Sequence, residues 1–329
     1  MATGISYVDE TLNPVVGCEP VSEGCARCYA ATFAARELCE THKGLTESGA
    51  WTGRVRLVPE ALERALRWTK PRRVLLPSMG DIFHDDVPDE YLAAIFGVMA
   101  ASPKHTWLVL TKRTKRLTAW LDWMDDWALV RGGRHDDTLA LAASQEVGAR
   151  AGTAVATGFR QWPPRSVLLG ATVENQRCAS ERLPELARLA DRGWRTWVSI
   201  EPLLGPVDLV CALLPPGMYA GEDMLDMADA TARRALARVE FAAIGGESGA
   251  DARPCNVSWL RSVVRQCEHA CMRVHLKQVG SHYIEPCNAV GGWLAKPPPE
   301  YGPLKRRLRH RFGGNPEEWP PDLRVRDLP

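Results

Sequence analysis

The sequence lacks a long hydrophobic run and carries almost no net charge. No apolar stretch reaches the roughly 18 residues that a membrane-spanning helix needs. The opening residues, MATGISYVDETLNPVV, have neither the basic start nor the continuous apolar core of a secretory signal peptide. The net charge of +1 gives no overall reason to expect a membrane surface or nucleic acid as partner. We therefore expect a cytoplasmic protein that is not membrane-bound.

Cysteine is too scarce for a disulfide scaffold. Ten cysteines among 329 residues are about 3%, below the ~8–10% that marks small disulfide-rich proteins. In a reducing compartment, cysteines that cluster in sequence are more often metal ligands or catalysts than disulfide partners. With 45% apolar and 25% charged residues, the chain has an ordinary globular composition and is long enough for one large domain or two smaller ones.

Short apolar runs recur along the chain, and helix-like segments separate them. Runs this short and continuous are typical of strands buried on both faces, as in a parallel sheet. The runs lie at 74–77, 107–111, 167–171, 196–201, 241–246 and 273–277, and the clearest helical spacing lies at 89–102, 180–193 and 258–270. Strand, loop and helix in alternation predict an α/β fold. We favour a closed or partial (β/α) TIM-type barrel over an open doubly wound sheet, since no G-x-G-x-x-G motif follows any run.

The domain organisation predicted from the sequence is one barrel with an appendage. We expect residues 1–295 to form the barrel and the Pro/Arg-rich residues 296–329 to form an extended C-terminal tail. The segments 125–165 and 214–238 are long for βα connections, so we interpret them as surface insertions. The tail contains the basic stretch KRRLRHR at 305–311, which is either a solvated surface segment or a phosphate-contacting patch.

Polar side chains follow each predicted strand at its carboxyl end. In parallel α/β folds these ends meet at one edge of the sheet, where the connecting loops surround a crevice. One small polar residue there can be a helix cap, but six polar strand ends in succession indicate the rim of one pocket. The groups that we assign catalytic roles are Asp81, Glu174, Glu201, Glu247 and Lys277. The groups that we assign to cofactor binding are Ser78, Thr111, Lys112, Arg113, Thr172, Asn175, Ser199, Gly245 and Gly246.

Three cysteines, Cys18, Cys25 and Cys28, lie together in the stretch GCEPVSEGCARCYA. They follow the apolar residues 14–17, which we expect to form the first strand, so they would enter the pocket from its first loop. Three thiolates can hold an iron–sulfur cluster and leave one iron open to a further ligand.

Other roles for these cysteines stay open at this point. A structural zinc site needs four ligands, and the candidates for the fourth, at an irregular spacing, are Cys39 and His42. The C-x-x-C pair is also the pattern of a redox dithiol. Cysteines without any ligand role are a further alternative.

The cysteine stretch resembles the opening of a phage-associated family of three-cysteine proteins of unknown function. The resemblance continues through PSMGDIFHDDVPDEY, LVLTKR, GATVENQ, IEPLLGPVDL, GGESGADARP, LKQVG and EEWPPDLRVRDLP, and it covers most of the chain from Asp9 onward. It implies a barrel of radical-SAM-like architecture in which Cys18, Cys25 and Cys28 hold a [4Fe–4S] cluster. In radical-SAM enzymes the open iron binds S-adenosylmethionine (SAM), whose reductive cleavage releases a 5′-deoxyadenosyl radical. Their usual spacing is C-x3-C-x2-C, whereas this chain has C-x6-C-x2-C.

These features together predict an iron–sulfur-dependent, radical-SAM-like enzyme that modifies or repairs a nucleic acid base or a nucleotide and takes electrons from an external donor. The nucleic-acid part depends on the phage association of the resembling family and on the basic stretch 305–311. One alternative is a zinc-stabilised nucleic-acid-binding module without catalysis. Another is a metal-free (β/α) enzyme that uses the carboxylates of Glu174, Glu201 and Glu247 for acid–base work. The sequence identifies neither the substrate nor the reductant nor the oligomeric state.

Overall fold

The computed structural model forms two compact units. Unit 1 comprises Met1–Ala171, Glu185–Trp197 and Pro329, and unit 2 comprises Thr172–Pro184 and Val198–Leu328. The residues that the structure describes are 4–38, 40–130, 132, 135–148, 162–214, 230–285, 304–306, 308–310 and 312–329.

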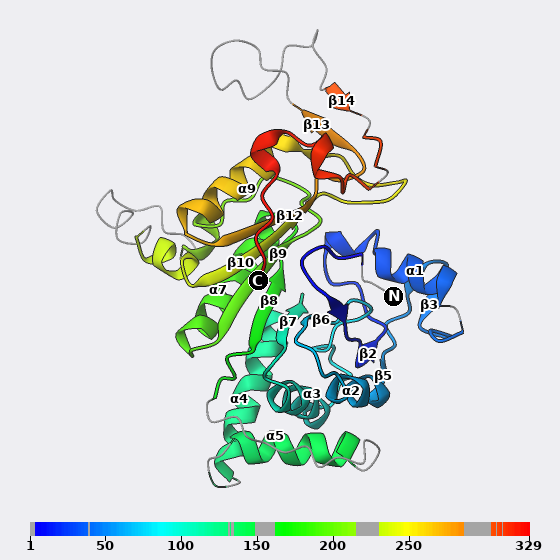
Figure 1. The fold of residues 1–329 in the computed structure, drawn as a ribbon, viewed down its shortest axis with the longest axis vertical. Helices are drawn as coiled ribbons and strands as arrows, with labels where there is room; N and C mark the ends of the chain where they lie inside the picture. Colours follow the sequence, from blue (N-terminus) through cyan, green and yellow to red (C-terminus); the bar gives the residue numbers. More distant parts are fainter. Residues whose placement is uncertain are drawn as a thin grey trace. The chain divides into compact units, whose positions relative to one another are not determined.

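A seven-stranded sheet in the order β1-β6-β7-β8-β9-β10-β12 is the main element of the fold (Figure 1). Its strands are β1 (Glu10–Thr11), β6 (Arg73–Leu76), β7 (Thr106–Thr111), β8 (Val167–Thr172), β9 (Arg195–Ile200), β10 (Val239–Gly245) and β12 (Arg273–Gln278). The pairings β1/β6, β6/β7, β7/β8 and β10/β12 are parallel. Because the order of the described strands runs from β1 to β12 without closing, the predicted α/β fold with a partial (β/α) TIM-type barrel is confirmed.

The central strands β8 and β9 are rich in apolar residues because both of their faces are buried. All six residues of β8 are buried, and so are the last five of β9. Gly170 of β8 leaves room for the indole of Trp197, which a Cβ at this position would overlap. The indole N–H of Trp197 then donates a hydrogen bond to the carbonyl of Val109 at 3.0 Å. A buried tryptophan thus packs across the strands with its polar atom satisfied.

The prediction that residues 14–17 form the first strand of the main sheet is wrong. The sheet begins instead at β1, which pairs in parallel with β6. Val15–Val16 forms β2, which pairs antiparallel with β5 (Arg56–Leu57) in a separate two-stranded ribbon. The prediction failed because β1 is a short edge strand of two polar, half-buried residues, and such a strand leaves no apolar run in the sequence.

The helices of unit 1 include one that is buried on nearly all sides. They are α1 (Tyr29–Glu37), α2 (Pro59–Leu66), α3 (Asp89–Ala101), α4 (Thr114–Val130) and α5 (His135–Ala143), and the shorter elements are η1 (Glu23–Cys25), β3 (Thr46–Glu47), β4 (Ala50–Trp51) and the π-helical turn η2 (Ser144–Gly148). Helix α3, predicted at 89–102, begins with two acidic residues and is buried from Tyr91 to Ala100 because α5 packs on it. Gly97 allows this close approach, since a Cβ there would lie 2.8 Å from the Cβ of Ala143.

Both predicted insertions lie partly outside the described residues. Within 125–165, the structure describes the end of α4, α5 and η2, so this part is helical, whereas residues 149–161 lie outside the described residues. Within 214–238, residues 230–236 are helical and residues 215–229 lie outside the described residues. Among the helices that the structure describes, none is long and apolar enough to span a lipid bilayer.

Unit 2 adds two long helices and a small sheet to its strands. Helix α7 (Gln176–Asp191) runs from unit 2 into residues of unit 1, and α9 (Val257–His269) precedes β12. The small sheet has the order β11-β13-β14, with strands β11 (Cys255–Asn256), β13 (Tyr283–Glu285) and β14 (Leu304–Arg306). Helix α7 begins before the predicted start at Ser180, because the side chain of Asn175 accepts a hydrogen bond from the N–H of Cys178 at 3.0 Å and caps the helix.

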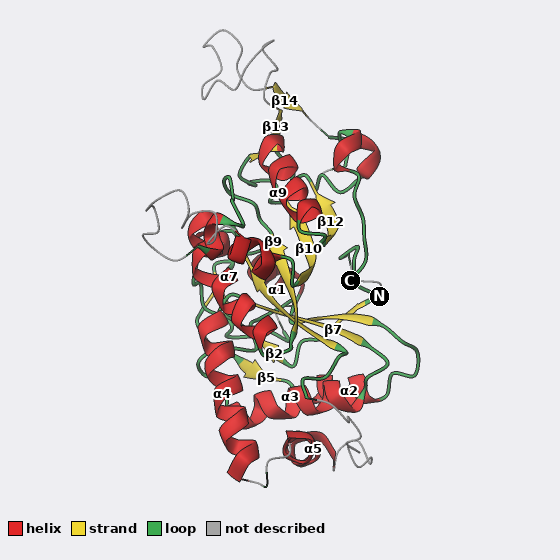
Figure 2. Ribbon diagram, turned by 90° about the vertical axis from the view of Figure 1, so that its left-hand side faces the viewer, coloured by secondary structure: helices red, strands yellow, loops and turns green. Residues whose placement is uncertain are grey.

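Residues 325–327 of the C-terminal segment 312–329 lie along strand β12. After the short helices η4 (Pro316–Glu318) and η5 (Pro321–Leu323), the tail descends as a loop beside β12 (Figure 2). The N–H of Leu276 donates to the carbonyl of Val325, and the N–H of Asp327 donates to that of Val274, both at 2.9 Å. These bonds cover the backbone groups of a sheet edge that would otherwise be open to a second chain. Of the basic stretch 305–311, the side chains of 305–307 and residue 311 lie outside the described residues.

Candidate functional site

The loop that carries the three cysteines, residues 17–28, is fixed at its start; we name it the cysteine loop. The N–H of Gly17 donates a hydrogen bond to the carbonyl of Met79 at 3.0 Å. Gly17 has a φ of +91°, and a Cβ there would overlap the carbonyl oxygen of Arg54. A Cβ on Gly80 would in turn lie 2.8 Å from the carbonyl oxygen of Gly17. Both glycines are therefore required for the close approach of these backbone segments.

The three cysteines of the loop are free thiols that are neither fully buried nor fully exposed. Cys25 ends the short helix η1, and its N–H donates to the carbonyl of Ser22 at 2.9 Å. Cys28 occupies the N-cap position of α1 and packs against a small core cluster that includes Val16 and Met79. Local structure thus holds the backbone of Cys25 and Cys28, and all three cysteines are half-buried.

Two cations from the end of β7 contact two of the sulfurs. The ammonium of Lys112 lies 3.4 Å from the Sγ of Cys25. The guanidinium of Arg113 donates to the Sγ of Cys18 at 3.7 Å and to the carbonyl of Glu19 at 3.2 Å. Cationic donors at a sulfur stabilise its thiolate form.

Asp81 anchors the strand end from which these cations come. Its buried carboxylate accepts hydrogen bonds from the Thr111 hydroxyl at 2.8 and 2.9 Å and from the Lys112 N–H at 3.1 Å. It also accepts from the Arg113 guanidinium at 3.4 Å and from the N–H of Phe83 at 3.0 Å. With its oxygens engaged by four residues, Asp81 is placed to hold the loop after β6 against the end of β7.

The thiols of Cys18 and Cys25 differ in acidity. Burial and, after it, the Asp81 carboxylate raise the pKa of Cys18 to about 11, although Arg113 acts to lower it. Burial also acts to raise the pKa of Cys25, but the Lys112 ammonium and hydrogen bonds from residues 21 and 22 outweigh it, so the pKa lies below the ordinary thiol value. Without a metal, Cys25 is therefore the more readily ionised of the two thiols.

Ser78 is held in place by a residue that the sequence analysis missed. The side chain of Asn13 accepts from the N–H of Ser78 at 2.7 Å and from the N–H of Met79 at 2.9 Å. The exposed ring of Tyr29 donates through its hydroxyl to the carbonyl of Ser78 at 2.9 Å. The sequence gives a weak signal for Asn13, a polar side chain directly before Pro14 in an otherwise apolar stretch.

The donor set of the cysteine loop fits an iron–sulfur cluster by its chemistry. Thiolates are the ligands that such clusters require, three of them lie on one short loop, and Lys112 and Arg113 supply positive charge beside an anionic centre. Within the part of the chain that the structure describes, no group of three or more His, Cys, Asp or Glu side chains is arranged to hold one metal ion. The loop is thus a set of suitable ligands and not a preformed metal cage.

Of the alternative fourth zinc ligands, His42 has no contact with the cysteine loop among the contacts of the described residues. His42 is buried and its Nδ1 lies 3.0 Å from the hydroxyl of Thr41. Its ring lies beside that of Trp51, with centroids 6.4 Å apart. Cys39 lies outside the described residues.

In unit 2, the end of β8 is organised around a buried ion pair. Glu174 is completely buried, and its carboxylate pairs with the guanidinium of Arg182 at 2.9 Å. The same guanidinium donates to the carbonyl of Thr172 at 2.6 Å. The carbonyl of Glu174 accepts from the N–H of Leu204 at 2.8 Å. Thr172, Glu174 and the helix cap Asn175 thus each make contacts that stabilise the fold. Their predicted functional roles stay predictions.

The ends of β9, β10 and β12 bring a second acid and a lysine together. The Nζ of Lys277 lies 3.6 Å from the Oε1 of Glu201, and the hydroxyl of Ser199 lies 3.5 Å from its Oε2. Oε1 of Glu201 is buried and accepts no hydrogen bond from any described residue. A Cβ on Gly245 would lie 2.6 Å from this oxygen. Four predicted site residues therefore meet here, and Gly245 provides the space for the carboxylate.

Replacing Gly245 by alanine is expected to destabilise the protein by about 1–3 kcal/mol, since the new methyl group would overpack the site and displace the Glu201 carboxylate from Lys277. Urea denaturation of the variant and the wild type measures this difference. The control is Gly205→Ala, where a Cβ meets no atom within 4 Å, and we expect a change within about 0.5 kcal/mol. A Gly245→Ala variant as stable as the control would contradict this packing.

Glu247 is the third predicted catalytic carboxylate of unit 2, and an arginine binds it. It accepts from the Nη2, the backbone N–H and the Nε of Arg253 at 2.6, 2.7 and 2.9 Å. The carbonyl of the neighbouring Gly246 accepts from the side-chain amide of Gln278 at 2.9 Å. Arg182 and Arg253 were missed by the sequence analysis, although Arg253 lies within the quoted stretch GGESGADARP.

The predicted site residues thus fall into groups that belong to one unit or the other. In unit 1 the structure brings together Cys18, Cys25, Asp81, Thr111, Lys112 and Arg113, with Ser78 and Cys28 on adjoining segments. In unit 2 it forms three pairs or clusters: Thr172 with Glu174, Ser199 with Glu201, Gly245 and Lys277, and Gly246 beside Glu247. The predicted catalytic and cofactor-binding roles of these residues stay predictions.

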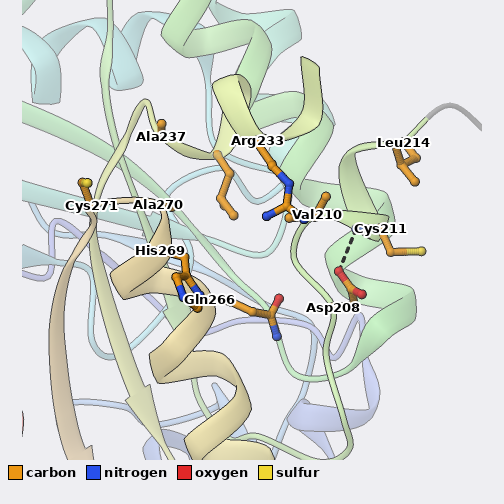
Figure 3. Close-up of a pocket in the computed structure, with 11 residues that line it drawn as sticks. Asp208, Val210, Cys211, Leu214, Arg233, Ala237, Gln266, His269, Ala270 and Cys271 are labelled. Carbon is orange, nitrogen blue, oxygen red and sulfur yellow. Dashed lines mark hydrogen bonds between the residues drawn. The ribbon is translucent and has the colours of Figure 1, made fainter. Parts of the chain in front are cut away.

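A separate cavity of about 420 Å³ lies in unit 2 (Figure 3). Its lining comes from residues 208–214, which follow β9, and from residues 233–237 and 266–271, which come just before β10 and β12. The last two groups lie at the amino ends of these strands, whereas the predicted rim is at the carboxyl ends. Arg233 extends into it, and the carboxylate of Asp208 accepts from the N–H of Cys211 at 2.8 Å on its border. The cavity is lined by none of the predicted site residues.

Comparison with known proteins gives one family and two similar structures. The model of a family described as "Protein of unknown function (DUF5131)" matches residues 2–310. Two solved variants of spore photoproduct lyase are similar in structure, with 13% and 12% sequence identity; each match covers 91% of this chain and 68% of the lyase chain, with a TM-score of 0.39. No curated protein matches the chain in sequence.

Proposed function

The chain belongs to the family described as a protein of unknown function, DUF5131, and from this premise we propose that it is an iron–sulfur-dependent, radical-SAM-like enzyme. The ligands of its [4Fe–4S] cluster are Cys18, Cys25 and Cys28. The observation that carries the proposal is the cysteine loop itself, in which three free thiols lie on one anchored segment and two of them face cations. Such a cluster, when bound, supplies single electrons for the reductive cleavage of SAM.

In this proposal some residues hold the cysteine loop in place and others transfer protons. Gly17 and Gly80 fix the start of the cysteine loop against neighbouring backbone, and Asp81 holds the end of β7 beside it. Of the predicted catalytic groups, we assign proton transfer to Glu201 and Lys277, because both side chains are partly exposed. The carboxylate of Glu174 is shielded from solvent and neutralised by its arginine, which suits a positioning task.

The proposed substrate is a nucleic acid base or a nucleotide. Its support is the basic stretch 305–311 in the sequence and the phage association of the family that the cysteine stretch resembles. Reductive cleavage of SAM also requires an external one-electron donor. We further propose a cytoplasmic location, because free thiols that cluster in sequence are typical of a reducing compartment.

The test is anaerobic reconstitution with iron and sulfide, followed by measurement of dithionite-dependent cleavage of SAM to 5′-deoxyadenosine. We expect the wild type to gain a brown colour and to release 5′-deoxyadenosine, and Cys25→Ala to lose both. The matched control is Cys211→Ala, which removes an exposed thiol of unit 2 and is expected to leave both unchanged. Cleavage that persists in the Cys25→Ala variant would remove the role assigned to this thiol.

A further inference from the structure

The tripeptide Thr-Lys-Arg occurs twice in succession, at 111–113, which begins with the last residue of β7, and at 114–116, which begins α4. The first copy supplies the two cations that contact the sulfurs of Cys25 and Cys18. In the second copy, Arg116 pairs with Asp89 at 2.6 Å and Lys115 is exposed. The two copies have the same sequence but different partners. The cations of the first copy contact cysteine sulfurs, whereas Arg116 of the second copy pairs with a carboxylate.

The contacts of the first copy are held by the fold. Asp81 accepts from the backbone N–H of Lys112 and from the Thr111 hydroxyl, so the direction of the chain at this point is fixed. The Nη1 of Arg113 lies between the carboxylate of Asp81 and the sulfur of Cys18, and the side chains of both charged residues are largely buried. Charge-assisted contacts in such surroundings are stronger than the same contacts in water.

We propose that Lys112 and Arg113 are positioning residues of the cluster, which donate hydrogen bonds to its ligand sulfurs and so raise both its retention and its reduction potential. This inference rests on the proposed function, since it assigns the two cations to the ligands of that site. Donors at a ligand sulfur withdraw electron density and offset the negative charge of the reduced cluster, which favours reduction. Asp81 keeps the donors in place.

The experiment compares Lys112→Met and Arg113→Met with the wild type after anaerobic reconstitution. Two quantities are measured: the loss of iron during incubation with a chelator, and the midpoint potential in a redox titration followed by electron paramagnetic resonance. We expect iron to be held about 10–100-fold more weakly in each variant, as is typical when a partner of a metal ligand is lost. We also expect the potential to move to more negative values.

Matched variants separate this role from a general loss of structure. Lys115→Met removes the exposed lysine of the second copy and is expected to behave as the wild type in both measurements. Lys112→Arg keeps a cationic donor and is expected to restore most of the wild-type potential. If Lys112→Met does not fold, Lys112→Gln removes the charge at similar length and is expected to give the same negative shift.

The outcomes distinguish this inference from the function on which it rests. If Lys112→Met and Arg113→Met keep the wild-type iron retention and potential while Cys25→Ala loses the cluster, the inference is overturned and the proposed function stands. If Cys25→Ala keeps the cluster, the ligand assignment fails, and the role of the cations fails with it.

Discussion

Replacing Arg182 by methionine is expected to destabilise the protein by about 3–5 kcal/mol, because the completely buried carboxylate of Glu174 would lose its cation. The carbonyl of Thr172 would lose a donor at the same time. The site is shielded from solvent and negatively charged, since burial and, after it, the Glu174 carboxylate together raise the pKa of the neighbouring Cys178 to about 11. Chemical denaturation of the variant measures the loss.

The matched control for this prediction removes both charges at once. In the double variant Glu174→Leu with Arg182→Met, no uncompensated charge stays buried, and we expect it to recover most of the stability that Arg182→Met alone loses. A single variant whose free energy of unfolding lies within about 1 kcal/mol of the wild type would show that the pair is not isolated from solvent.

Removal of residues 312–329 is also expected to destabilise the protein strongly. The truncated protein would lose the buried side chains of Trp319 and Leu323, and burial of such side chains contributes roughly 1.5–3 kcal/mol each. It would also expose the backbone of β12, which the tail now covers through the hydrogen bonds of Leu276 and Asp327. We expect a lower melting temperature and self-association in size-exclusion chromatography, since an open edge strand pairs readily with another chain.

A substitution within the tail serves as its control. Asp322→Ala breaks the ion pair with Arg261 at 2.6 Å but leaves the tail in place. This pair is partly exposed, so its loss is expected to cost less than about 1 kcal/mol. If the truncated protein elutes and melts as the wild type does, the tail does not protect the sheet edge.

The sheet could be predicted from the sequence because its strands are buried on both faces. Strands with two buried faces require apolar residues, so six strands can be located in the sequence as short apolar runs: β6, β7, β8, β9, β10 and β12. The edge strand β1 could not be found in this way, since its two residues, Glu10 and Thr11, are polar. The sequence predicts the start of α7 at Ser180, whereas the helix is capped by Asn175, a residue to which the sequence analysis assigns cofactor binding.

The sequence predicts which residues belong to the candidate site but not which of them contact one another. Cys18, Cys25 and the polar strand ends are visible in the sequence, whereas the contacts between them are long-range. Lys112 and Cys25 are 87 positions apart, and Arg113 and Cys18 are 95 positions apart. Nothing in the local pattern indicates that these cations face sulfurs, because that pairing depends on the way Asp81 joins the loop after β6 to the end of β7.

The iron and acid-labile sulfide content of the protein purified without air tests the central claim most directly. Three thiols on one loop, two of them beside cations, predict iron and sulfide in nearly equal amounts, about four of each per chain. The variant in which Cys18, Cys25 and Cys28 are all alanine is expected to contain neither. A colourless wild type with one zinc per chain and no sulfide, or a triple variant with undiminished iron, would contradict the account.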